Sequence, residues 1–163
     1  MLEEIPGDAP IRYFPETRSE RPLLVRFRLP DGSSWVGGFG AGRLAARACS
    51  GVFASPSPKR ACVVSGGRVY AVDVEHPDRT TVVVPELVMQ VVPDVVAGLL
   101  LLADPWQLHG YAADGLKWSS GRIAIEGLSV LAADAQTALV CMENADGELE
   151  ERKVDVRTGR LVA

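Results

Sequence analysis

Two matching phrases in the sequence, Asp31-Gly32-Ser33-Ser34-Trp35 and Asp114-Gly115-Leu116-Lys117-Trp118, decide the interpretation of the fold. Each phrase joins a turn-forming Asp-Gly pair to a tryptophan placed four residues after the aspartate. Asp73 and Asp155 extend the series, so that successive aspartates lie 42, 41 and 41 residues apart. The spacing predicts an internal repeat of about 41 residues, in which the four aspartates occupy equivalent turns.

Short runs of β-prone residues flank each aspartate, and Gly- and Pro-containing turns separate the runs. In one run, Arg26 and Arg28 alternate with apolar neighbours, which is typical of a half-buried strand. Residues 42–49 and 86–92 contain helix-forming side chains, but both segments are short and we interpret them as strands or turns. The expected strands include residues 23–29, 60–64, 68–74, 80–84, 98–103, 137–142 and 148–156, and 160–163 could add a final outer strand. The sequence therefore predicts an all-β fold of about four repeated antiparallel β-units.

A period near 41 residues matches the 40–45 residues of one four-stranded propeller blade. Residues 113–118 and 154–159 resemble the strand ends and turns of β-propeller-like repeat proteins of the quinoprotein-like and WD-type groups. The resemblance implies a small or partial β-propeller-like domain, in which tryptophans pack between neighbouring sheets. No unit carries the whole phrase, and four units are fewer than is usual in that group. We therefore transfer no cofactor and no functional residue from it.

Length and composition predict one domain over residues 1–163, with an irregular N-terminal segment over 1–21. The net charge is −4 and no Lys/Arg cluster occurs, which argues against nucleic acid as a partner. The most apolar region, residues 87–103, is interrupted by polar residues and prolines, so we expect no membrane span. The three cysteines lack paired spacing, which indicates a reducing, cytoplasmic setting without disulfides. We expect Cys62 and Cys141 to be buried and Cys49 to be the most exposed.

No local motif predicts a catalytic, cofactor-binding or metal-binding residue. His76 lies in a turn and His109 in an apolar strand, and both are interpreted as structural or solvent-facing. The acidic segment 143–148 lacks the order of a calcium loop and is interpreted as a turn, while the charged run 148–153 is interpreted as a solvated strand face. The glycine-rich segment 37–42 lacks the lysine of a phosphate loop and is expected to form a bulge or wide turn.

These observations favour a non-catalytic binding or scaffold module with a protein partner, and they leave one alternative open. The alternative is a small-ligand-binding protein or enzyme whose site lies in a central channel between the β-units. A homodimer would be one way to cover the exposed sheet edges of an unclosed array. The partner, the pathway and the closure of the β-units are not determined by the sequence.

Overall fold

The computed structural model describes residues 10–14, 21–42, 48–83, 87–94 and 96–162. The described chain is all-β and forms four separate sheets, with one 3₁₀ turn at Pro77–Arg79. The strands are β1 Ile11–Phe14, β2 Leu23–Arg28, β3 Ser34–Phe39, β4 Gly51–Ala54, β5 Arg60–Ser65, β6 Arg68–Asp73, β7 Thr81–Val83, β8 Gln90–Val91, β9 Leu100–Ala103, β10 Leu108–Ala112, β11 Gly115–Ser119, β12 Ser129–Ala133, β13 Thr137–Glu143, β14 Leu149–Asp155 and β15 Leu161–Val162. The predicted all-β class is confirmed, and the described parts of the expected runs contain strands, including the final strand near the C-terminus. The segment 43–47, within the run 42–49, lies outside the described residues.

Strand order follows chain order in three of the four sheets. The second sheet (β4–β7), the third (β8–β11) and the fourth (β12–β15) are each four-stranded and antiparallel. The first sheet has the order β1-β3-β2, in which β1 pairs in parallel with β3 and β2 pairs antiparallel with it. Short turns suffice for the antiparallel neighbours, which explains the regular alternation of strand runs and turn residues along the sequence.

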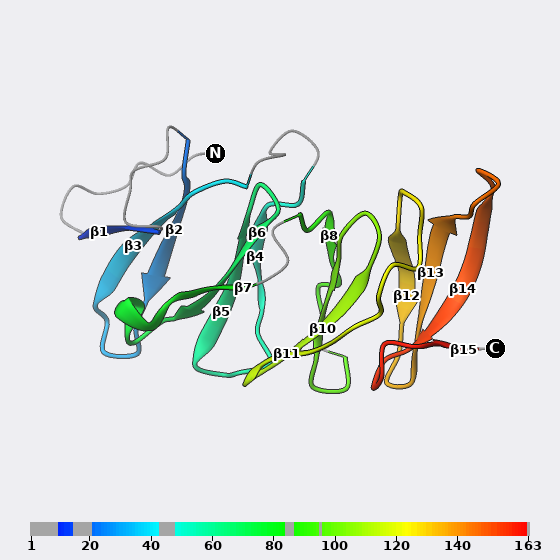
Figure 1. Ribbon diagram of the computed structural model, residues 1–163. Helices are drawn as coiled ribbons and strands as arrows, with labels where there is room; N and C mark the ends of the chain where they lie inside the picture. Colours follow the sequence, from blue (N-terminus) through cyan, green and yellow to red (C-terminus); the bar gives the residue numbers. More distant parts are fainter. Residues whose placement is uncertain (1–9, 15–20, 43–47, 84–86, 95, 163) are drawn as a thin grey trace.

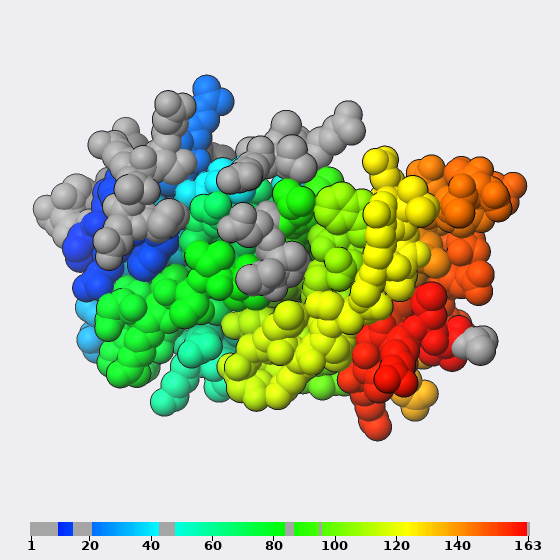
Figure 2. All heavy atoms as spheres, in the orientation of Figure 1, coloured from blue at the N-terminus to red at the C-terminus, as the bar shows by residue number. Residues whose placement is uncertain are grey.

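The four sheets stand side by side in a row, with the first and the fourth at opposite ends (Figure 1). The space-filling view follows the same order from blue to red along the molecule (Figure 2). Buried clusters lie between neighbouring sheets, and each cluster combines residues of two successive sheets. Phe39 and Tyr70 belong to the first cluster, Cys62 and Leu100 to the second, and Leu101 to the third. Burial between sheets, rather than within one shared core, holds the described chain together.

The central strands of the second and third sheets are buried on both faces, whereas the fourth sheet is buried on one. In β9, Leu100 and Leu102 face the second sheet while Leu101 packs toward the fourth, and all of them are fully buried. In β13, buried residues alternate with half-buried ones, because only one face meets the third sheet. Cys141 lies on the other face and is half-buried, so its predicted burial is wrong, whereas that of Cys62 is confirmed.

The four regularly spaced aspartates, Asp31, Asp73, Asp114 and Asp155, lie at or next to strand ends. Asp73 and Asp155 end the third strand of their four-stranded sheets, Asp114 lies just after the third strand of its sheet, and Asp31 lies in the β2–β3 turn. Asp31, Asp73 and Asp155 accept backbone N–H groups from residues two or three positions later, at 2.8–2.9 Å. Asp114 instead accepts the ammonium of Lys117. The turns are therefore held by short-range carboxylate hydrogen bonds.

Two tryptophans connect neighbouring sheets through the same type of contact. Trp35 of the first sheet donates its indole N–H to the carbonyl of Val74 in the second, at 3.0 Å. Trp118 of the third sheet donates to the carbonyl of Val156 in the fourth, at 2.9 Å. Each acceptor directly follows one of the regularly spaced aspartates, since Val74 follows Asp73 and Val156 follows Asp155. The expectation that these tryptophans pack between sheets is confirmed for both.

The predicted bulge or turn at residues 37–42 is wrong for its first half. Gly37 and Gly38 lie inside β3, the central strand of the first sheet. Large rings occupy the space that side chains would take there: a Cβ on Gly37 would lie 2.6 Å from Cζ of Phe39, and one on Gly38 would lie 2.6 Å from Cδ1 of Tyr13. The glycines thus allow aromatic side chains to cover the strand, which is a packing role that glycine also serves in sheets.

Candidate functional site

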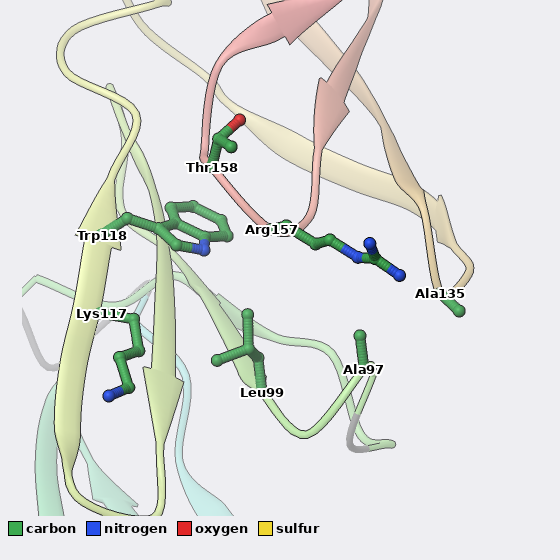
Figure 3. A pocket seen from close by; sticks show the side chains of 7 residues that line it. All are labelled: Ala97, Leu99, Lys117, Trp118, Ala135, Arg157 and Thr158. Carbon is green, nitrogen blue, oxygen red and sulfur yellow. The ribbon is translucent and has the colours of Figure 1, made fainter.

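A cleft of about 830 Å³ opens between β11 of the third sheet and the turn that follows β14 in the fourth. Figure 3 shows the indole of Trp118 beside the turn that carries Arg157 and Thr158. The residues that line the cleft are Ala97, Leu99, Lys117, Trp118, Ala135, Arg157 and Thr158. The cleft therefore combines an apolar and aromatic wall with two cationic side chains and one hydroxyl.

The indole of Trp118 is fixed by close backbone approaches from two sheets. Gly110 lies opposite Trp118 in the β10–β11 pair, and a Cβ there would lie 2.6 Å from the indole Nε1. A Cβ on Gly159 of the fourth sheet would lie 2.8 Å from the indole Cδ2. Together with the hydrogen bond to the Val156 carbonyl, these contacts hold the indole ring in a single position. A preformed wall lowers the ordering cost of any ligand that packs on it.

The Asp155 turn presents Arg157 and Thr158 to the cleft. Asp155 Oδ1 accepts hydrogen bonds from the hydroxyl of Thr158, at 2.9 Å, and from the backbone N–H groups of Arg157 and Thr158. The Thr158 side-chain bond, followed by these backbone bonds, lowers the pKa of the Asp155 carboxyl. The Asp155 carboxylate is therefore ionised at neutral pH. Its hydrogen bonds hold the turn from which the Arg157 side chain extends.

The two cations of the cleft differ in their partners. Lys117 Nζ lies 2.6 Å from Asp114 Oδ2, an exposed pair three residues apart. Within the part of the chain that the structure describes, Arg157 forms no ion pair, and its side chain extends past the cleft toward Ala135 (Figure 3). The guanidinium is therefore a donor available to a carboxylate of a ligand.

The opposite wall of the cleft comes from a tight turn before β9. Val96 and Leu99 form both backbone hydrogen bonds of the turn, at 2.7 and 2.8 Å. Its central residues, Ala97 and Gly98, have φ angles of +50° and +78°. Left-handed φ angles at both central positions define the turn type that suits a two-residue hairpin, although alanine adopts them at a cost.

A second constellation of polar side chains lies on the other face of the third sheet. His109 on β10 is buried, and its Nε2 lies 2.9 Å from Oδ2 of the buried Asp104. Its Nδ1 lies 2.7 Å from Oγ of Ser119, an exposed residue on the neighbouring strand β11. The three residues thus form a continuous Ser–His–Asp hydrogen-bonded chain that reaches the surface at the serine.

Asp104 also caps the turn between β9 and β10. Its Oδ1 accepts the backbone N–H groups of Trp106 and Gln107, each at 2.7 Å. Burial alone would raise the pKa of Asp104, but the bonds from His109 and from these two amides together hold it below its usual value. The carboxylate is therefore ionised at neutral pH, and the network has a structural role in the turn whatever else it does.

Sequence reasoning placed His109 in an apolar strand, but it did not bring this residue together with Asp104 and Ser119. If the pairing that begins at Ala112 and Gly115 continued without interruption, Trp118 would lie opposite His109. A register shift between Gly110 and Tyr111 instead places Ser119 opposite His109. The pairing depends on this one-residue irregularity, for which the local sequence carries no distinct signal.

The other candidate residues stay apart. His76 is exposed in the turn before Pro77, as expected, and the acidic segment 143–148 forms the β13–β14 turn, in which Asn144 Oδ1 accepts two backbone N–H groups. β14 carries the charged run as a largely exposed strand, also as expected. Among the described residues, no three His, Cys, Asp or Glu side chains gather as metal ligands would.

A scan against protein-family models finds no match, and searches among curated proteins and solved structures find none of significance. In the described part of the chain, no helix has the length and apolar character needed to cross a membrane. The functional interpretation therefore depends on the geometry of the cleft and of the Ser–His–Asp chain.

Proposed function

We propose that this protein is a non-catalytic protein-binding module, and that the cleft between the third and fourth sheets receives an acidic segment of its partner. The observation that carries the proposal is the pairing of a fixed indole with an arginine that has no ion pair among the described residues. We further propose that the four sheets are repeats of one propeller-like unit. The common strand order of three sheets and the two matching tryptophan contacts support that reading.

The lining of the cleft defines the chemistry of the segment. Leu99, Ala97 and Ala135 provide an apolar surface beside the Trp118 ring, so an apolar side chain can be buried there. Arg157 can form a charge-assisted pair with a carboxylate, which fixes the orientation of the segment. Aromatic and arginine side chains are the types that dominate binding energy at protein interfaces. The predicted ligand is an extended peptide that carries an acidic residue close to an apolar one.

A random peptide library displayed on phage tests this assignment with the intact chain as the target. We expect enriched peptides to combine Asp or Glu with a nearby apolar residue. Their binding, measured by fluorescence anisotropy, should fall at least about tenfold in Arg157→Glu, because a charge pair is replaced by a repulsion. Arg160→Glu is the matched control, since Arg160 is exposed near the same turn but does not line the cleft. No enrichment, or equal losses in both variants, would contradict the proposal.

The Ser–His–Asp chain favours one second candidate, an enzyme that uses Ser119 as a nucleophile. The exposed hydroxyl lies within hydrogen-bond reach of an imidazole that a buried carboxylate orients, which is the arrangement that activates serine in acyl transfer. A fluorophosphonate probe should then label the wild type but not Ser119→Ala. Ser120→Ala serves as the control, because Ser120 Oγ binds the backbone of the same strand pair instead. Absence of labelling in the wild type eliminates this candidate.

A further inference from the structure

The outer face of the fourth sheet is open to water along β13 and β14. In β13, half-buried residues alternate with residues that are buried against the third sheet, so the half-buried ones form the outer face. Their neighbours on the same face of β14, Leu149, Glu151 and Lys153, are exposed. The turns at both ends of these two strands belong to the described chain. No described sheet covers this face, which lies at one end of the row (Figure 1).

The centre of this outer face is apolar. Leu139 and Cys141 occupy successive outward positions of β13. On β12, the residues opposite them are small, since Ala132 lies opposite Leu139 and Ser129 lies opposite Cys141, so a second sheet can approach this part of the face closely. Leu149 of β14 is 72% exposed and adds apolar surface at the end of the strand. A contiguous exposed apolar surface of this kind is typical of a protein–protein interface.

The charges beside the apolar centre are arranged so that the face is complementary to a copy of itself. On β14, Glu151 lies opposite Cys141 and Lys153 lies opposite Leu139, so the two charges occupy neighbouring outward rows of the sheet. A twofold axis that runs across the strands, midway between these rows, exchanges the two rows between copies. Lys153 of each copy then faces Glu151 of the other, and Leu139 faces Cys141. Such a self-complementary surface is what a twofold interface requires.

We propose that this outer face is the interface of a homodimer, in which the fourth sheets of two copies pack face to face about this axis. The apolar centres cover each other, and opposite charges meet beside them. In the dimer, β13 acquires the two-sided burial that β9 already has within the chain. A twofold interface is closed, so the assembly ends at two copies. The proposal concerns the face of the fourth sheet that points away from the cleft, so either proposal can fail without the other.

Solution mass tests the dimer on the full chain. Light scattering coupled to size exclusion should give twice 17.4 kDa for the wild type at high concentration. Leu139→Glu should weaken dimerisation at least about tenfold, because the dimer would bury a carboxylate from each copy in its apolar centre. Leu116→Glu is the matched control, since Leu116 is 46% exposed on β11 of the third sheet, away from this face. A monomeric wild type, or equal dimerisation of the wild type and both variants, overturns the proposal.

Charge exchange tests how the two copies are oriented. Glu151→Lys and Lys153→Glu each place like charges opposite one another, so each variant should dimerise at least about tenfold more weakly than the wild type. The two changes in one chain should restore the dimer. Mixing the two single variants, one of them labelled with ¹⁵N, should give a heterodimer in native mass spectrometry. Circular dichroism and thermal unfolding check that each variant is folded. A double variant as weak as the singles, or a mixture that stays monomeric, overturns the proposed arrangement.

Discussion

Replacement of Gly110 by alanine tests whether the Trp118 joint holds the third and fourth sheets together. The backbone of Gly110 has no left-handed φ, so alanine is compatible with the strand itself. Its methyl group, however, would lie 2.6 Å from the indole Nε1. The ring cannot withdraw freely, because Gly159 approaches it from the fourth sheet and Val156 accepts its N–H.

Two opposing effects determine the magnitude for Gly110→Ala. Overpacking of this kind costs about 1–3 kcal/mol. Alanine is otherwise preferred over glycine inside a strand by about 0.5–1 kcal/mol, because glycine loses more backbone entropy on folding. The clash is the larger effect, so we expect the free energy of unfolding to fall by about 1–2 kcal/mol. In a Trp118→Ala background the clash is absent, and the same substitution should raise the free energy of unfolding by about 0.5 kcal/mol.

Urea unfolding followed by circular dichroism measures the four proteins of this double-mutant cycle. The sign reversal between the two backgrounds is the decisive result, because a general effect of alanine on the strand would have the same sign in both. A wild-type background that tolerates Gly110→Ala without loss would refute the reasoning. So would an equal loss in both backgrounds, which would show that the indole is not the obstacle.

Three further substitutions test other contacts by urea unfolding. Asp104→Ala should lower the free energy of unfolding by about 3 kcal/mol at pH 7, because it leaves the buried His109 and two amides without their acceptor. Since the folded pKa of Asp104 lies below its usual 3.8, this difference should persist at pH 5 and shrink as the pH falls below 4; a constant difference would contradict the carboxylate's role. Ala97→Gly should raise the free energy of unfolding by about 0.5–1 kcal/mol by relieving a left-handed alanine, and a decrease would show that the turn is unstrained. Gln90→Leu should lower it by about 2 kcal/mol, because the Gln90 amide makes both hydrogen bonds to the Val130 backbone of the next sheet; no change would mean that water replaces them.

Strand positions and turns were predictable because they depend on neighbours in the sequence. Valine-rich runs and Asp-Gly or Gly-Gly pairs define the hairpins without reference to distant residues. The tryptophan contacts were predictable in type, because an aromatic side chain four residues after a turn aspartate recurs at Trp35 and Trp118. Their acceptors, the carbonyls of Val74 and Val156, become evident only once the sheets are placed side by side.

The candidate sites were not predictable, because each depends on residues from separate strands. The Ser119–His109 contact requires the register shift at Gly110, and a regular hairpin would have placed an indole there instead. The cleft likewise joins the turn at Ala97 to the turn at Arg157, sixty residues apart in the sequence. Composition and local pattern say nothing about such distances, so the sequence offered no binding residue.

The wrong expectation for Cys141 carries information about the fourth sheet. It came from the continuous apolar run of residues 138–142, a pattern that favours a strand buried on both faces. The comparable run in β9 is buried in this way, because a sheet packs on each side of it. In β13 the same kind of sequence meets a sheet on one side only, and Leu139 and Cys141 keep part of their surface in water. A polar alternation would suit a solvated face better.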